Sequence, residues 1–173
     1  SFGRAVAYAD EDSPTACEAW VNRGVAHAQL GEYDEAVGAY REALRIDGDG
    51  EHAAAAETNL AYALWELGDS SAPLDRAERA VELDPRLPQA WYNRGFFLAE
   101  RGLHEEAVRC FDAAIALGMR DASVRGERER STRSSKLTPS RARPKRGKAR
   151  PRNAPATRRP RRASPPPTRL TRT

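Results

Sequence analysis

Apolar and small residues recur at helical spacing along the first two thirds of the chain, in paired segments separated by a glycine. In the first pair, Trp20, Gly24 and His27 lie three or four positions apart, which places them on one helical face. Gly31 follows Leu30, where such a helix would end. A second apolar stripe follows, formed by Ala36, Val37, Tyr40, Ala43, Leu44 and Ile46. The pattern therefore predicts two helices joined by a short turn.

This pattern returns at a fixed interval. The segment from Ala19 to Gly24 recurs as the segment from Ala90 to Gly95. A weaker copy fits between them, which predicts three repeats at residues 17–50, 54–87 and 88–121, with residues 51–53 as an insertion. A period of about 34 residues indicates a solenoid in which each repeat packs on its neighbours.

The residues that recur have a family resemblance. The first repeat has Trp20, Gly24, Gly31, Tyr33, Ala36, Tyr40, Ala43 and Leu44. The third has Trp91, Gly95, Gly102, Ala107, Phe111, Ala114 and Ile115, and the second has Leu60, Ala61, Leu64, Gly68, Ala77, Ala80, Asp84 and Pro85. At these spacings, residues 17–121 resemble the tetratricopeptide repeat (TPR) family. The resemblance implies an all-α fold, a right-handed α-solenoid of antiparallel helix pairs whose first helices line a concave groove.

The middle repeat departs most from the family pattern. Glu57 replaces the tryptophan, Ala77 replaces the bulky aromatic residue and Pro73 replaces a small alanine. Because proline is tolerated only in the first turn of a helix, we expect Ser70 and Ser71 to precede a helix that starts late. We predict that residues 54–87 form the least stable repeat.

The resemblance also implies a peptide-binding groove. Carried over by position, its lining residues are Glu18, Asn22, Val25, Gln29, Ala55, Asn59, Tyr62, Glu66, Gln89, Tyr92, Asn93, Phe96 and Glu100. Asn22, Asn59 and Asn93 recur at one repeat position, and their amides could hold a peptide backbone. The alternative is that they are consensus residues that are solvated or bonded to a neighbouring helix.

One class of TPR partner is not expected. The family members that clamp chaperone C-terminal carboxylates use lysine, asparagine and arginine side chains at five groove positions. Here those positions hold Val21, Val25, Asn59, Gln89 and Asn93. Without cations the carboxylate has no counter-charge, so we predict a neutral or basic protein partner.

No catalytic residue, metal site or cofactor is predicted. No two histidines have metal-ligand spacing, and His27 is expected to pack in the core. Cys17 and Cys110 lie two repeats apart, too far for a disulfide, and are expected to be free thiols. No apolar run is long enough to cross a bilayer, so we predict a cytoplasmic, non-catalytic interaction module.

Charge divides the chain. Residues 1–121 contain 11 Arg against 23 Asp or Glu, a balance of −12, whereas residues 122–173 contain 18 basic and two acidic residues, a balance of +16. We predict that residues 122–173 form a basic disordered tail, with its densest cluster at Arg158, Arg159, Arg161 and Arg162. Three interpretations stay open: the tail binds nucleic acid, it folds back on the acidic array, or it is a byproduct of GC-rich coding sequence. The first makes a nucleic-acid-associated protein the alternative function.

The two ends of the repeats carry further expectations. The chain begins at Ser1 and its sole methionine is Met119, so we expect a processed chain or a fragment. Residues 1–16 would then contain part of an upstream repeat helix and a linker. The segment 121–130 has too few apolar residues to cover Ile115 and Leu117, which predicts a bare face after the third repeat.

Overall fold

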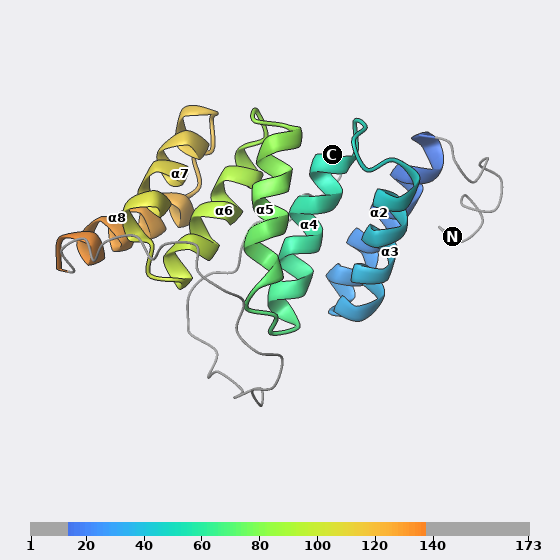
Figure 1. Ribbon diagram of the computed structural model, residues 1–173, viewed down its shortest axis with the longest axis horizontal. Coiled ribbons are helices and arrows are strands. Elements are labelled where there is room, and N and C mark those ends of the chain that lie inside the picture. Colours follow the sequence, from blue (N-terminus) through green and yellow to red (C-terminus); the bar gives the residue numbers. More distant parts are fainter. Residues whose placement is uncertain (1–13, 138–173) are drawn as a thin grey trace, which may run out of the picture.

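The computed structural model describes residues 14–137, and these form an all-α solenoid (Figure 1). Its helices are α2 (Pro14–Leu30), α3 (Tyr33–Ile46), α4 (Ala53–Glu66), α5 (Ala72–Leu83), α6 (Pro88–Glu100), α7 (His104–Ala116) and α8 (Ala122–Leu137). The described residues contain no strand. The predicted fold class is therefore confirmed for this part of the chain.

The helices form two layers. Each helix packs on the next in sequence, and in addition α2 contacts α4, α4 contacts α6 and α6 contacts α8. Among the described helices, α3, α5 and α7 do not contact one another. The layer made by α2, α4, α6 and α8 is therefore the more tightly stacked one, and the array curves around it.

Glycine ends the first helix of each pair because the chain must take a left-handed conformation there. Gly31 has φ +80° after α2, and Gly102 has φ +79° after α6. At the first of these turns the Glu32 backbone N–H donates to the His27 carbonyl at 3.0 Å, which closes the end of α2. The turn is then short enough to return the chain antiparallel to α2.

Small residues allow close contact between paired helices, as the repeat pattern predicts. Gly24 and Gly95 are buried, and a Cβ atom on Gly24 would lie 2.5 Å from the Tyr40 ring. Trp20 packs in a cluster with residues of α3 and α4, and Trp91 packs in clusters with residues of α5 and α7. The contacts that identified the repeats from sequence are thus contacts of the fold.

The middle repeat accommodates its departures by polar contacts. Glu57 is 5% exposed in the position of the missing tryptophan, and its carboxylate pairs with Arg76 of α5 at 3.3 Å. Burial raises the pKa of Glu57, although Arg76 opposes the shift. The helix α5 starts late, at Ala72, as expected. Its capping carboxylate comes from Asp69, which accepts hydrogen bonds from the backbone N–H groups of Ser71 and Ala72 at 2.8 and 3.0 Å.

Two predictions about the end of the array are wrong. Residues 122–137 are not a disordered tail, because they form α8, and α8 packs on α7 and α6. Val124, Glu127 and Ser131 are buried along one face of α8, and Glu127 pairs with Arg130. A capping helix needs only a narrow contact stripe when its outer face stays polar, which explains why its charged composition concealed it. The rest of the predicted tail, and the predicted upstream helix before residue 14, lie outside the described residues.

The prediction for His27 is also corrected. Its side chain is 25% exposed, and its Nδ1 lies 2.7 Å from a Glu32 carboxylate oxygen across the turn. The imidazole is held at the edge of the helix pair because Glu32, at the start of α3, offers it a polar partner. It is therefore not a packed core residue.

Candidate protein-binding surface

The first helices of the repeats present one continuous face on the more tightly stacked layer. We call it the inner face and define it by the residues Glu18, Asn22, Val25, Gln29, Ala55, Asn59, Tyr62, Trp65, Glu66, Gln89, Tyr92, Asn93, Phe96 and Glu100. Except for Trp65, these are the groove residues predicted from the sequence. Contacts of α4 with both α2 and α6 bring the three helices together, so the inner face spans all three repeats.

Exposure differs along the inner face. Glu18, Asn22, Gln29, Ala55, Glu66, Gln89 and Glu100 are partly or fully exposed, whereas Val25, Asn59, Tyr62, Tyr92, Asn93 and Phe96 are buried. The exposed members lie mainly at the two ends of each helix. A ligand on this face would therefore meet polar and charged groups at its margins and apolar groups between them.

The three recurring amides are not equivalent. Asn22 is half-buried, but Asn59 and Asn93 are 1% and 0% exposed. The Asn93 side-chain N–H donates to the Thr58 carbonyl of α4 at 3.3 Å. This is the contact that the alternative interpretation requires, and it joins α6 to α4. A role for the amides in holding a peptide remains a prediction.

An unbroken series of aromatic rings crosses the array at the inner layer. Tyr33 of α3 contacts Tyr62 with ring centroids 6.1 Å apart, and Tyr62 contacts Trp65 at 6.4 Å. Trp65 meets Phe96 edge-to-face at 5.3 Å, and Phe96 meets Phe97 at 5.7 Å. We call these five residues the aromatic row. Trp65 is only partly buried, so the row has an accessible member on the inner face.

Sequence reasoning missed the aromatic row as a unit. Its members were assigned to groove, turn or core separately, and Trp65 was not assigned at all. The signal was present: Trp65 follows Tyr62 by three positions and therefore shares its helical face. Edge-to-face geometry of this kind stabilises ring pairs beyond the area that they bury.

Carboxylates flank the aromatic row. The Tyr62 hydroxyl donates to Glu66 at 2.8 Å, and burial together with this contact raises the pKa of Tyr62. Glu100 lies at the corresponding end of α6 and is exposed, and Glu18 lies near the start of α2. The acidic groups thus lie beside the aromatic rings and do not replace them.

No arginine or lysine of α2, α4 or α6 lies on the inner face. Arg23 stacks over the Trp20 ring at 4.9 Å, and Arg94 lies 5.7 Å from the Trp91 ring centroid. Arg94 also pairs with Glu78 of α5 at 3.6 Å, so it points toward the other layer. The inner face of the three repeats is therefore acidic and aromatic.

The inner layer continues into α8. Glu127 of α8 is buried beside Tyr92, and its carboxylate pairs with Arg130. Burial raises the pKa of Glu127, with Glu100 adding to the shift and Arg130 opposing it. Burial and the Glu127 carboxylate raise the pKa of Tyr92 to about 12, so its hydroxyl stays protonated at neutral pH.

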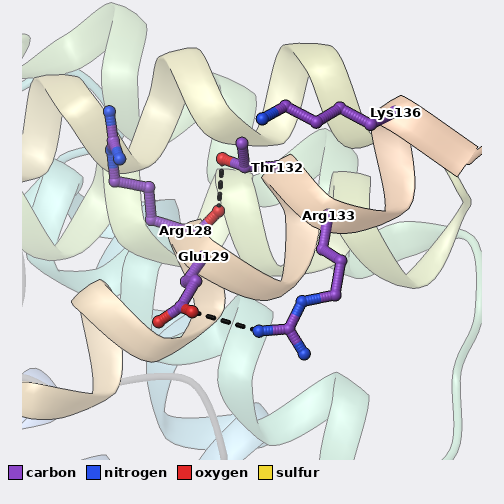
Figure 2. A pocket seen from close by; sticks show the side chains of 5 residues that line it. All are labelled: Arg128, Glu129, Thr132, Arg133 and Lys136. Atoms are coloured by element: carbon purple, nitrogen blue, oxygen red, sulfur yellow. Dashed lines mark hydrogen bonds and ion pairs between the residues drawn. The ribbon is translucent and has the colours of Figure 1, made fainter.

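A separate hollow lies on the exposed side of α8 (Figure 2). It is lined by Arg128, Glu129, Thr132, Arg133 and Lys136, all from this one helix. Arg133 pairs with Glu129 at 3.0 Å, and Arg128 pairs with Asp112 of α7 at 2.5 Å. Since two of its three cations already have carboxylate partners, the hollow has little free positive charge for a phosphate.

The two thiols are free and buried in the described structure. Burial raises the pKa of Cys110 to about 11 and also raises that of Cys17, so both are protonated at neutral pH. Among residues 14–137, no group of three or more His, Cys, Asp or Glu side chains is arranged to hold a metal ion. Within the same range, no helix has the length and apolar character needed to cross a membrane.

Comparison with known protein families agrees with this geometry. Two profiles described as tetratricopeptide repeat match residues 17–49 and residues 58–122. The chain belongs to the TPR family. This TPR chain is 34% identical over 98 residues to the photosystem I assembly protein Ycf3 of Acaryochloris marina, covering 53% of the chain and 59% of that protein. For Ycf3 of Synechococcus elongatus the identity is 33% over 103 residues, covering 56% and 60%. The TPR chain thus spans less than two thirds of the length of these curated relatives.

Solved TPR domains have the same fold. The Arabidopsis OM64 TPR domain is 24% identical with a TM-score of 0.63, covering 68% of this chain and 95% of that one. The first TPR domain of Spaghetti (RPAP3), bound to the HSP90 peptide SRMEEVD, is 20% identical with a TM-score of 0.63, covering 68% and 91%. At these identities the likeness establishes the fold.

Proposed function

We propose that the TPR array is a non-catalytic adaptor that binds a segment of another protein on its inner face. The observation that carries the proposal is the aromatic row with carboxylates beside it and no cation from α2, α4 or α6. Aromatic side chains supply a large share of the energy of protein interfaces. Carboxylates at the margin then favour partners with complementary charge.

The chemistry of the inner face favours a basic or neutral segment. The Spaghetti domain binds a peptide, SRMEEVD, with three acidic residues. In this chain the positions expected to clamp such a peptide hold Val21, Val25, Asn59, Gln89 and Asn93, and Val21 and Val25 are buried. An acidic peptide would meet Glu66 and Glu100 without a compensating cation, which disfavours it electrostatically.

The curated relatives support an adaptor role without specifying the partner. Both are named photosystem I assembly proteins, and an assembly factor must hold other proteins. The alternative function, nucleic-acid binding through Arg158, Arg159, Arg161 and Arg162, concerns residues outside the described range. On α8 itself the paired arginines do not favour a phosphate site.

Arrays of short synthetic peptides of basic, neutral and acidic composition test the proposal. The full chain should retain basic and neutral peptides, and Glu66→Lys combined with Glu100→Lys should weaken that retention. Glu82→Lys is the matched control, because it makes the same charge reversal at an exposed position of α5. Preferential retention of acidic peptides, or equal effects of all three substitutions, would contradict the proposal.

A further inference from the structure

We propose that the inner face takes the basic, proline-rich segment 138–173 of this same chain as an intramolecular ligand, which competes with outside partners. The inference rests on the proposed function, since both concern one surface. It adds the identity of an occupant and a means of regulation. The described structure ends at Leu137, where α8 completes the inner layer, so the segment begins at the edge of that face.

Charge complementarity is the first argument. Residues 138–173 contain 13 Arg or Lys and no Asp or Glu. On the inner face, Glu18, Glu66 and Glu100 stand without an arginine or lysine from the same three helices. The outer layer is different, because Arg76, Arg79 and Arg45 already pair with carboxylates there. A basic segment therefore finds more uncompensated negative potential inside the curve than outside it.

Side-chain chemistry is the second argument. The segment contains eight prolines and no aromatic residue, whereas the inner face provides the aromatic row. Proline-rich segments bind aromatic-lined surfaces with a low entropic cost, because the polyproline conformation is already extended. Arginine guanidinium groups also stack on tyrosine and tryptophan rings, as Arg23 does on Trp20 in this molecule. Trp65 and Tyr62 could receive the same contact beside Glu66.

Reach is the third argument. Helices packed at 8–10 Å spacing make the inner layer about 30 Å across. A polyproline chain as long as residues 138–173 would extend about 110 Å, at roughly 3.1 Å per residue. The segment is therefore long enough to run from α8 back over α6, α4 and α2.

A spin label on the segment tests its location. Thr157→Cys, beside the Arg158–Arg162 cluster, would carry a nitroxide in the full chain. The native thiols are buried and protonated, so the label should attach selectively at position 157. We expect paramagnetic broadening of the backbone amide signals of Asn22, Glu66 and Glu100, and little at Glu82 or Glu105 of the outer layer. The broadening should weaken as salt rises, since the screening length falls from about 10 Å at 0.1 M to about 3 Å at 1 M.

Two variants separate the possible outcomes. Replacing Arg158, Arg159, Arg161 and Arg162 with Ser should remove the inner-face broadening, and Glu66→Lys with Glu100→Lys should reduce it. Dilution of labelled into unlabelled chain controls for contacts between molecules. Broadening confined to α8 or the outer layer, or no broadening anywhere, would overturn the proposal.

Competition supplies a second readout. A fluorescent peptide with the sequence of residues 154–167 should bind the Arg→Ser chain more tightly than the unmodified chain. With an effective concentration near 1 mM for a tethered segment and a peptide Kd on the order of 0.1 mM, the difference should be about tenfold. Equal affinities would contradict internal competition. If inner-face broadening is seen but no outside peptide binds either chain, the internal contact stands and the adaptor function fails.

Discussion

Replacing Gly24 with Ala should destabilise the array, although alanine is normally the better helix residue. A Cβ atom at this position would lie 2.5, 2.7 and 2.9 Å from three atoms of the Tyr40 ring. Tyr40 is fully buried, so its ring cannot swing into solvent to make room. Overpacking of a tight core costs about 1–3 kcal/mol, while Gly→Ala in a helix gains about 1 kcal/mol. We expect Gly24→Ala to lower the free energy of unfolding by about 1–2 kcal/mol.

The chain provides matched controls for this substitution. Gly38, in the middle of α3, would place its Cβ with no heavy atom within 4 Å. Gly38→Ala should therefore raise the free energy of unfolding, by up to about 1 kcal/mol. Gly95→Ala should fall between them, because its Cβ would lie 2.8 Å from Phe111 and 3.1 Å from Cys110.

Urea denaturation followed by circular dichroism measures all three variants. The reasoning predicts the order Gly38→Ala, unmodified chain, Gly95→Ala, Gly24→Ala from most to least stable. A double variant of Gly24→Ala with Tyr40→Leu should be less destabilised than the sum of its parts, because the smaller side chain relieves the contact. If Gly24→Ala were as stable as Gly38→Ala, the close approach of α2 and α3 would not be a tight contact, and the explanation of the repeat pattern would fail.

Three further predictions concern the middle repeat. Asp69→Ala removes the acceptor for two backbone N–H groups at the start of α5 and should cost about 1 kcal/mol in urea denaturation, whereas Asp69→Asn should cost less. Although burial opposes it, hydrogen bonding lowers the pKa of Asp69, so its contribution is present above the ordinary Asp pKa and is lost as pH falls through the lowered value; Asp69→Ala should lack this acid dependence. Glu57→Leu should be stabilising near neutral pH, because the raised pKa of Glu57 makes its contribution favourable below the ordinary Glu pKa and progressively lost as pH rises; the advantage of the variant should grow between about pH 4 and 7 and be absent if the carboxylate is well solvated. Trp65→Ala should weaken binding of basic peptides and cost about 2 kcal/mol of stability, whereas Trp65→Phe should retain most of both; equal binding by the two variants would remove Trp65 from the site.

The contacts that could be predicted from sequence are those repeated within each unit. Gly24 with Tyr40 and Gly95 with Phe111 recur at one spacing, so the period alone indicates that each pair lies together. The late start of α5 followed from Pro73 in the same local way. Contacts of this kind need no knowledge of neighbouring repeats.

The parts that sequence reasoning missed depend on contacts between units. The capping helix α8 buries Val124, Glu127 and Ser131, a stripe with one apolar member that hydrophobic periodicity cannot detect. Whether a recurring asparagine faces solvent or the next helix depends on the stacking angle, and Asn93 bonds to the Thr58 carbonyl. The aromatic row likewise exists only because α3, α4 and α6 bring single rings from different repeats together.

The charge of the inner face follows from where the arginines lie. Arg23 and Arg94 replace leucine in the family pattern, and stacking on Trp20 and Trp91 keeps both away from the inner face. Arg101, just after α6, donates to the carbonyls of Ser70 and Ser71 at 3.2 and 2.8 Å. Arginines that could have neutralised Glu66 and Glu100 are thus engaged in holding turns and layers together. The same packing that stabilises the repeats therefore leaves an acidic, aromatic surface, and a basic segment is the ligand that this surface favours.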